Sequence, residues 1–324
     1  MKEDKSIGKN WSSKSIGTKF QHNFFYIMIK MGGRRLAYLI LYFVVFYYAT
    51  FVSSVKAKTD PYLSRRFPEA SDIKHFFHRY MLILQFGKTL IDRAIVGILG
   101  PESIKASFQS EEDVTRLKQL PGGFVLMLSH VGSWQVAMSA LALFQKPINL
   151  LMQLNTEDVD KHYYEHSDGE KKPFNIINPE GYLGGVIEMV NVLKNDEVLC
   201  IMGDRVFADA PSSLDVNFLN EKTAFPYSAY KIASLSKKPI VVLYSFKTGP
   251  SSYQLKIAEI IEIPGKLGRT KENFKPYLEK FVKSLESFTE EYPYQFFNFY
   301  DMWNTSVDTN ENHSEQSVEK LNEA

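Results

Sequence analysis

One histidine stands where the sequence predicts the end of a buried strand and the start of a helix. Residues 124–128 form a continuous apolar run after the turn residues 121–123, which is typical of a strand covered on both faces. Gly132 and Ser133 then break the strand, and Ser133 can cap a following helix. Ligands of α/β sheets bind at the carboxyl ends of strands, so His130 is a candidate general base there. The alternative is a histidine that only bonds to backbone at the strand end.

The segment His130-Val-Gly-Ser-Trp-Gln135 resembles the His-x-Gly-Asn-Trp-Glu block of the bacterial lipid A late acyltransferases. That family is related to the glycerolipid acyltransferases, whose signature is a histidine, four residues, and Asp or Glu. In both, the histidine deprotonates an acceptor hydroxyl that attacks an acyl thioester, and the carboxylate orients the imidazole. The resemblance implies His130 as the catalytic base and Gln135 as its orienting partner, with Ser133 and Trp134 among the substrate-binding residues.

Gln135 keeps a hydrogen-bond acceptor but loses the negative charge that the family has at this position. In serine protease triads the equivalent loss lowers the rate by about 10⁴-fold. Two functional classes therefore stay open. The chain is either a working acyltransferase adapted to glutamine, or a catalytically weak or inactive lipid-binding protein on the same fold.

A second group of chemically capable residues, Gly203-Asp204-Arg205, follows the apolar run 198–202. This run also predicts a buried strand, so we expect Asp204 and Arg205 to face the same cleft as His130. Arg205 offers a bidentate cation for a phosphate or a carbonyl oxygen of the substrate, with Asp204 supporting it. The alternative is an Asp–Arg pair that only holds a loop.

Two further segments resemble the same family. Residues 202–226 are similar to its second block, and residues 292–298 are similar to its C-terminal Pro-x-Gln-Trp segment. The resemblance covers roughly residues 20–303 in ordered blocks. It implies acyl transfer from a thioester, with acyl carrier protein as the donor partner, to a hydroxyl of a lipid A precursor or another glycolipid. It also implies a bacterial inner-membrane enzyme that works at the cytoplasmic face.

The N-terminal region carries a long apolar run, residues 36–52, that is crowded with Tyr and Phe and contains no charge. Basic residues flank it, including Lys30 and Arg34 before it and Lys56 and Lys58 after it. A run of this length is at the lower limit for a membrane span, and tyrosine favours the membrane–water interface. We therefore predict membrane association, either as a span or as an interfacial helix. A buried core helix is the alternative.

After residue 101 the chain alternates apolar strand-like runs with amphipathic helical segments, which is typical of a three-layer α/β fold. The predicted strands are 124–128, 148–154, 174–177, 198–202, 215–219, 240–246 and 253–263, the last as a possible edge; the predicted helices are 71–99, 156–166, 182–193, 226–236 and 271–292. The fold class is thus α/β, with a central mixed sheet flanked by helices, similar to the glycerolipid acyltransferases.

The predicted organisation has four parts. Residues 20–100 form membrane-associated helices and residues 101–303 form the α/β acyltransferase domain, between polar tails at 1–19 and 304–324 that we expect to be disordered.

The net charge of +1 gives no footprint for nucleic acid. Cys200 is the only cysteine, which excludes disulfides. His162 and His166 have metal-compatible spacing but no third ligand, so we expect neither a metal nor a bound organic cofactor.

Overall fold

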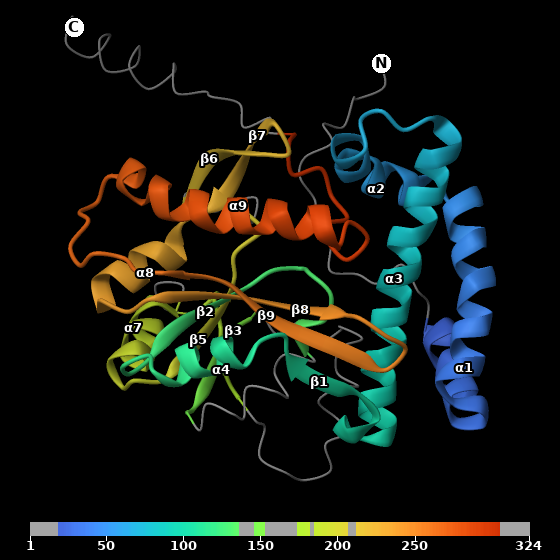
Figure 1. Cartoon of the computed structure of the whole chain (residues 1–324), viewed down its shortest axis with the longest axis horizontal. Coiled ribbons are helices and arrows are strands. Elements are labelled where there is room, and N and C mark those ends of the chain that lie inside the picture. Colours follow the sequence, from blue (N-terminus) through green and yellow to red (C-terminus); the bar gives the residue numbers. More distant parts are fainter. Residues whose placement is uncertain (1–18, 136–145, 153–173, 182–184, 207–211, 305–324) are drawn as a thin grey trace, which may run out of the picture.

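A mixed sheet with helices on its faces and a helical unit beside it make up the protein (Figure 1). The structure is a computed structural model that describes residues 19–135, 146–152, 174–181, 185–206 and 212–304. Its helices are α1 (Lys19–Phe51), α2 (Ser53–Arg66), α3 (Asp72–Leu99), η1 (Pro101–Ser103), α4 (Glu111–Lys118), α7 (Val186–Lys194), α8 (Ser228–Ser236), η4 (Lys271–Phe274) and α9 (Lys275–Glu291). Its strands are β1 (Lys105–Phe108), β2 (Phe124–Leu128), β3 (Ile148–Leu151), β4 (Asn175–Ile177), β5 (Val198–Met202), β6 (Ser213–Phe218), β7 (Glu221–Pro226), β8 (Ile240–Lys247) and β9 (Ser252–Ile261).

The central sheet has seven strands in the order β1-β9-β8-β2-β5-β3-β4. Strands β4, β3, β5, β2 and β8 are parallel, and β9 joins β8 antiparallel, so β1 and β9 run against the other five. The predicted α/β class with a mixed sheet is confirmed. Strand β2 lies at the centre, and all five of its residues are buried, as its unbroken apolar run predicts.

One prediction about the place of a strand was wrong, and one predicted strand lies outside the central sheet. Strand β9 is not an edge, because β1 pairs along its outer side. The four residues of β1 alternate between exposed and half-buried, which leaves no apolar signal in the sequence. Strand β6 pairs only with β7, in a separate two-stranded sheet. Leu219 and Asn220 connect these two strands with positive φ of 51° and 65°, the backbone of a tight hairpin turn.

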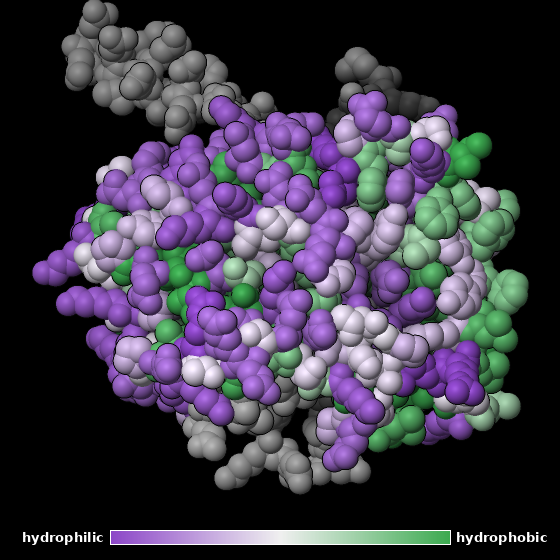
Figure 2. Space-filling view, viewed as in Figure 1, coloured by the Kyte–Doolittle hydropathy of each residue, from purple (hydrophilic) through white to green (hydrophobic). Residues whose placement is uncertain are grey.

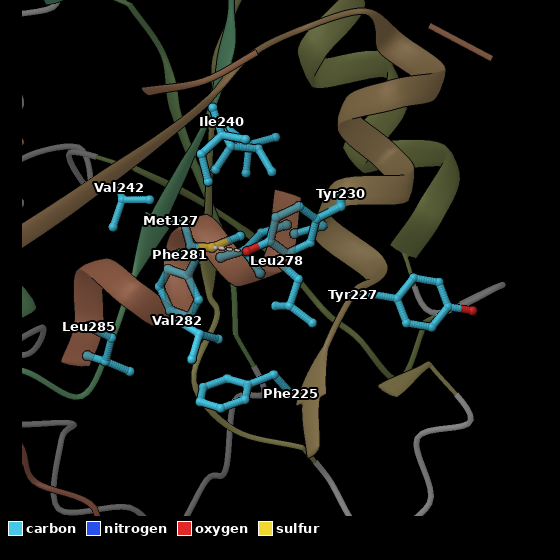
Figure 3. Close-up of a cluster of buried hydrophobic side chains, with 14 of the residues drawn as sticks. Met127, Phe225, Tyr227, Tyr230, Ile240, Val242, Leu278, Phe281, Val282 and Leu285 are labelled. Carbon is cyan, nitrogen blue, oxygen red and sulfur yellow. Dashed lines mark hydrogen bonds between the residues drawn. The ribbon is translucent and has the colours of Figure 1, made fainter. Parts of the chain in front are cut away.

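The main core lies between one face of the sheet and helices α7, α8 and α9. Met127 of β2 points from the sheet toward α8 and α9, where Phe281 lies beside it and the Tyr230 hydroxyl donates to its sulfur at 3.4 Å (Figure 3). The opposite face packs Leu126 and Leu128 with Leu117 of α4. Alternate residues of β2 therefore anchor in two cores, which fixes the position of the strand end that precedes His130.

Helices α1 and α3 pack along each other beside the sheet (Figure 1). The inner face of α1 supplies Ala37, Leu41 and Val45 to a small core with α3. A break at Gly33 interrupts α1, with φ of 62° and ψ of −159°. The N-terminal helices are thus shown, whereas their membrane association stays a prediction.

The outer face of α1 is apolar and exposed, and forms the hydrophobic rim visible in Figure 2. Among the described helices none is by itself long and apolar enough to cross a membrane. Residues 24–51 and 53–66 pass that test only as a pair, with a bend of 87° between them.

Candidate active site

Paired strands bring His130 and Asp204 together. Strands β2 and β5 are parallel in a register that matches Leu128 with Met202. His130 lies two residues after the end of β2, and Asp204 lies two residues after the end of β5, so the two residues occupy matching positions. The backbone N–H of Gly203 donates to the carbonyl of Leu128 at 2.9 Å, which extends the pairing into the loops. The structure thus brings these two predicted residues together at the carboxyl ends of the strands.

The Asp204 carboxylate holds His130 through both backbone and side chain. Its Oδ2 accepts from the backbone N–H of His130 at 2.9 Å. The imidazole Nδ1 lies 3.0 Å from Oδ1 and 3.1 Å from Oδ2 of the same carboxylate. Asp204 is fully buried, whereas the His130 side chain keeps 27% of its surface exposed. The buried carboxylate thus orients an imidazole that substrate can still reach.

Gly203 makes this approach possible. A Cβ at this position would lie 2.7 Å from the sulfur of Met127 and 3.2 Å from the Phe281 ring. A side chain at this position would push Met127 and Phe281 out of their packing, so glycine lets the chain leave β5 in close contact with the core and brings Asp204 to the site.

The loop that carries His130 lies between the end of β8 and a C-terminal segment. Phe297 N–H donates to the His130 carbonyl at 2.7 Å, and Gly132 N–H donates to the Gln295 carbonyl at 2.8 Å. On the other side, Ser133 N–H donates to the Ser245 carbonyl at 2.9 Å. Backbone hydrogen bonds to β8 on one side and to the C-terminal segment on the other therefore fix the loop.

Arg205 completes the arrangement at the same strand end. Its Nη2 donates to the Phe297 carbonyl at 2.9 Å, and its guanidinium lies 5.7 Å from the centre of the Tyr300 ring. In a regular antiparallel ladder the His130 N–H would pair with the Phe297 carbonyl. Here the Asp204 carboxylate accepts from the His130 N–H, and the Arg205 guanidinium donates to the Phe297 carbonyl. The two side chains therefore replace one backbone hydrogen bond of the ladder, and Arg205 also brings a positive charge to the site.

The electrostatics favour a neutral imidazole beside an ionised carboxylate. Burial first, and then the nearby Arg205 guanidinium, lower the pKa of His130, against the opposing pull of Asp204. Burial alone would raise the pKa of Asp204, but His130 and Arg205 together hold it below its ordinary value. An ionised Asp204 accepts a hydrogen bond from Nδ1–H of His130, which leaves the Nε2 lone pair of the ring free for a substrate proton.

The structure places Gln135 differently from the expectation. Asp204, rather than Gln135, occupies the Nδ1 side of the His130 ring. The amide oxygen of Gln135 instead accepts from the Ser133 hydroxyl at 3.4 Å, and both side chains are buried. Since Gln135 lies in the first turn after the loop, its side chain supports the loop from inside. The orienting role that the resemblance implies for position 135 is thus filled by Asp204.

The other predicted residues divide between the core and the site. Trp134 is half-buried and packs against the smaller core that contains Leu126 and Leu128. The backbone N–H of Ser133, a residue that we expected to cap a following helix, donates to the Ser245 carbonyl, and residues 136–145 lie outside the described part of the chain.

His162 and His166 also lie outside the described residues, as do the two predicted tails except at their inner ends. Within the described ranges, no group of three or more His, Cys, Asp or Glu side chains is placed to hold a metal ion.

Sequence reasoning missed the contribution of the segment 295–297 to the site. It matched the C-terminal Pro-x-Gln block, yet assigned no role to it. Gln295 is buried, and its side-chain amide makes two hydrogen bonds with the backbone of Lys247 at 2.8 and 2.9 Å. A buried glutamine in an aromatic run is a signal that could have been used, because such an amide needs several partners.

Comparisons with known proteins find a matching family and a similar solved structure. The family model of the bacterial lipid A biosynthesis acyltransferases matches residues 8–305. A similar solved structure is the 1-acyl-sn-glycerophosphate (LPA) acyltransferase PlsC from Thermotoga maritima. It is 14% identical over 80% of this chain and 98% of that chain, with a TM-score of 0.37. The comparison with curated proteins finds no match. Because the family model covers nearly the whole chain, the protein belongs to the bacterial lipid A biosynthesis acyltransferase family and is an acyltransferase.

Proposed function

We propose that the protein moves a fatty acyl chain from acyl carrier protein to a hydroxyl of a lipid A precursor or a related glycolipid. The observation that carries this proposal is the pairing of His130 with the buried carboxylate of Asp204 at the carboxyl ends of β2 and β5. This pair has the features of a general base, namely a half-buried ring with part of its surface exposed, a fixed orientation and a lowered pKa of the imidazole.

In the proposed reaction, Nε2 of His130 removes the proton of the acceptor hydroxyl as its oxygen attacks the thioester carbonyl. The new C–O bond forms, the C–S bond breaks, and the imidazolium returns the proton to the departing thiolate. Asp204 keeps the proton on Nδ1 and stabilises the imidazolium as it forms. Arg205 is a half-buried cation next to this pair, and it would stabilise negative charge on the attacked carbonyl or hold a phosphate of the acceptor.

We further propose that the reaction takes place at the cytoplasmic face of the bacterial inner membrane. Acyl carrier protein is a soluble donor, whereas a lipid A precursor is held in a bilayer, so the enzyme has to work at their boundary. The exposed apolar face of α1, with Phe43, Tyr47 and Phe51 on its surface, supports contact with the bilayer. Exposed Lys30, Lys56 and Lys58 near this helix suit anionic head groups.

The competing function is lipid binding without catalysis. Its main support was the uncharged Gln135 in place of an acidic residue. Asp204 supplies a negative charge to the imidazole from a different strand, and that removes the reason to expect a decayed site. We therefore favour the working enzyme.

The test is acyl transfer by purified full-length protein in nonionic detergent. Acyl carrier protein and coenzyme A thioesters are compared as donors, with lipid A precursor, a glycolipid and lysophosphatidic acid as acceptors, and mass spectrometry identifies the product. We expect transfer from acyl carrier protein to the glycolipid-type acceptors, abolished by His130→Ala. His75→Ala, which removes a half-buried histidine of α3, is the matched control and should keep activity. Equal product from His130→Ala would overturn the proposal.

A further inference from the structure

A buried carboxylate in α3 connects the N-terminal helices to the sheet. Asp92 has no exposed surface, and its two oxygens accept from four side chains. Arg34 Nε and the Tyr38 hydroxyl, both on α1, lie 3.1 and 2.7 Å from Oδ1. Lys247 Nζ at the end of β8 and the Tyr253 hydroxyl on β9 lie 2.6 and 2.7 Å from Oδ2. One carboxylate thus joins α1, α3, β8 and β9.

This arrangement changes the interpretation of Arg34. The sequence places it among the basic residues that flank the apolar run, where head groups would neutralise it. In the structure the Arg34 guanidinium turns inward, and Nη2 also donates to the Ser103 carbonyl at 3.0 Å. Arg34 therefore attaches α1 to the rest of the protein, and its neighbour Arg35 is exposed.

The same connection continues to the His130 loop. Lys247, held by Asp92 through its side chain, bonds through its backbone with Gln295: the Lys247 N–H donates to Gln295 Oε1 at 2.8 Å, and Gln295 Nε2 donates to the Lys247 carbonyl at 2.9 Å. The carbonyl of Gln295 then accepts from Gly132 N–H at 2.8 Å. Hydrogen bonds and ion pairs thus run without a gap from α1 to the residue two positions after His130.

The loop has little freedom to absorb a shift of Gln295. The backbone of Gly132 has φ of 51°, and a Cβ there would lie 2.0 Å from the Ser245 carbonyl oxygen. The loop is therefore in close contact with β8 on one side and with the segment 295–297 on the other. A displacement of Gln295 would consequently move the His130 backbone relative to Asp204, which lies two residues after the end of the buried strand β5.

We propose that Asp92, Lys247 and Gln295 are positioning residues for His130, and that α1, through Arg34 and Tyr38, is part of the active-site scaffold. The inference rests on the proposed function of His130 as the base. It differs from the idea of a simple anchor, because α1 is then needed for catalysis even when the acceptor is dispersed in detergent and membrane binding is not required.

The experiment compares full-length Gln295→Met and Arg34→Met with the matched control Arg35→Met, which removes the same charge one residue away. All are assayed in nonionic detergent with acyl carrier protein thioester and dispersed acceptor, and kcat is normalised to folded protein. Misplacement of about 1 Å can lower a rate by about 10²-fold, so we expect kcat to fall about 10- to 100-fold in both variants, with KM nearly unchanged. Arg35→Met should stay within about twofold of the wild type, and Arg34→Lys should recover part of the loss, because it restores the charge.

A second measurement does not depend on activity. NMR titration of the His130 ring reports its pKa, and a ring displaced from Asp204 titrates at a different pH in Gln295→Met than in the wild type. A wild-type protein without any transferase activity would refute the proposed function, and the titration would still test the positioning. Wild-type kcat and an unchanged His130 titration in folded Gln295→Met and Arg34→Met would overturn the inference. Tyr38→Phe, which removes one hydrogen bond to Asp92 and keeps the ring, replaces Arg34→Met if that variant does not fold.

Discussion

At the scale of single residues, the proposed chemistry depends on one carboxylate and its place in the chain. The family signature has this charge a few residues after the histidine. Here the charge comes from Asp204, which follows a different strand and lies 74 residues from His130 in the chain. Asp204 places a carboxylate acceptor on Nδ1 of His130. What matters physically is the charge and geometry at that nitrogen, so a change at position 135 does not by itself remove catalysis.

We predict that Asp204→Asn lowers kcat much more than any substitution of Gln135. The amide cannot stabilise the imidazolium or fix the tautomer, and in serine protease triads this change lowers the rate by about 10⁴-fold. Gln135→Ala loses only the contact with Ser133 and should lower kcat by about tenfold or less, since a neutral hydrogen bond contributes about 0.5–1.5 kcal/mol. Gln135→Glu should be neutral or harmful, because it adds a second negative charge in a buried position.

Single-turnover rates of the four proteins check this prediction. Gln135→Glu faster than the wild type, together with a small effect of Asp204→Asn, would mean that position 135 and not Asp204 controls the base.

The pH dependence follows from the same group of charges. The pKa of His130 is lowered from its ordinary value of 6.5, and the base works only when deprotonated. We therefore expect the acid limb of the kcat/KM profile to lie below pH 6.5, with activity lost as the pH falls through it. Arg205→Met removes a positive charge that disfavours the imidazolium, so the acid limb should move to higher pH, whereas the conservative Arg205→Lys should leave it nearly in place. A limb that moves downward, or does not move, in Arg205→Met contradicts the assigned electrostatics.

At the scale of elements, the critical feature is the close fit of the His130 loop between β8 and the C-terminal segment. We predict that Gly132→Ala destabilises the protein and also impairs catalysis. Its φ of 51° costs a side-chain residue about 1–2 kcal/mol, and the clash with the Ser245 carbonyl adds to this. The Tm of thermal unfolding should therefore fall by several degrees, because each kcal/mol of lost stability lowers the Tm by about 2–4 °C for a domain of this size.

Gly100→Ala is the control for this prediction. Gly100 also has a positive φ of 86°, but a Cβ there meets nothing within 4 Å, so only the backbone term applies. Gly132→Ala should lower both the Tm and kcat, and Gly100→Ala should lower the Tm alone. Equal kcat in the two folded variants would show that the fit of the loop has no catalytic role.

The comparison of sequence and structure shows which information is local. Strand β2 and its boundaries follow from an unbroken apolar run, and the site at its end follows from the rule for parallel strands. The partner of His130 does not follow, because it depends on the register between β2 and β5, which sequence periodicity alone cannot set. Strand β1 is too short and too exposed to carry a pattern. The inward turn of Arg34 depends on Asp92, far away in the chain, and a local reading places every arginine near an apolar run at the surface.

At the scale of the whole molecule, the helical unit and the sheet form one connected structure with two different surfaces. Helix α1 covers α3 with one side and exposes Leu39, Phe43 and Tyr47 on the other. The inner side of α1 packs on α3, and its residues Arg34 and Tyr38 bond to the buried Asp92. Helix α1 therefore cannot be surrounded by lipid while this packing persists. We therefore expect an interfacial helix that lies on the bilayer with its outer face in the acyl region, rather than an isolated span.

This orientation gives the last prediction, on Phe43 and Phe51, which are 72% and 69% exposed. Full transfer of such a side chain into an apolar phase contributes about 1.5–3 kcal/mol, so Phe43→Ser and Phe51→Ser should each weaken binding to anionic vesicles by about tenfold or more. Leu235→Ser is the matched control, because this leucine of α8 is 63% exposed on a different part of the protein and should not alter binding. The measurement is cosedimentation of the full chain with anionic and zwitterionic vesicles, at low and high salt, without detergent. Basic residues beside α1 should make binding tighter on anionic vesicles and weaker at high salt. A wild-type protein that stays in the supernatant, or a Leu235→Ser variant that loses as much binding as Phe43→Ser, would contradict the orientation.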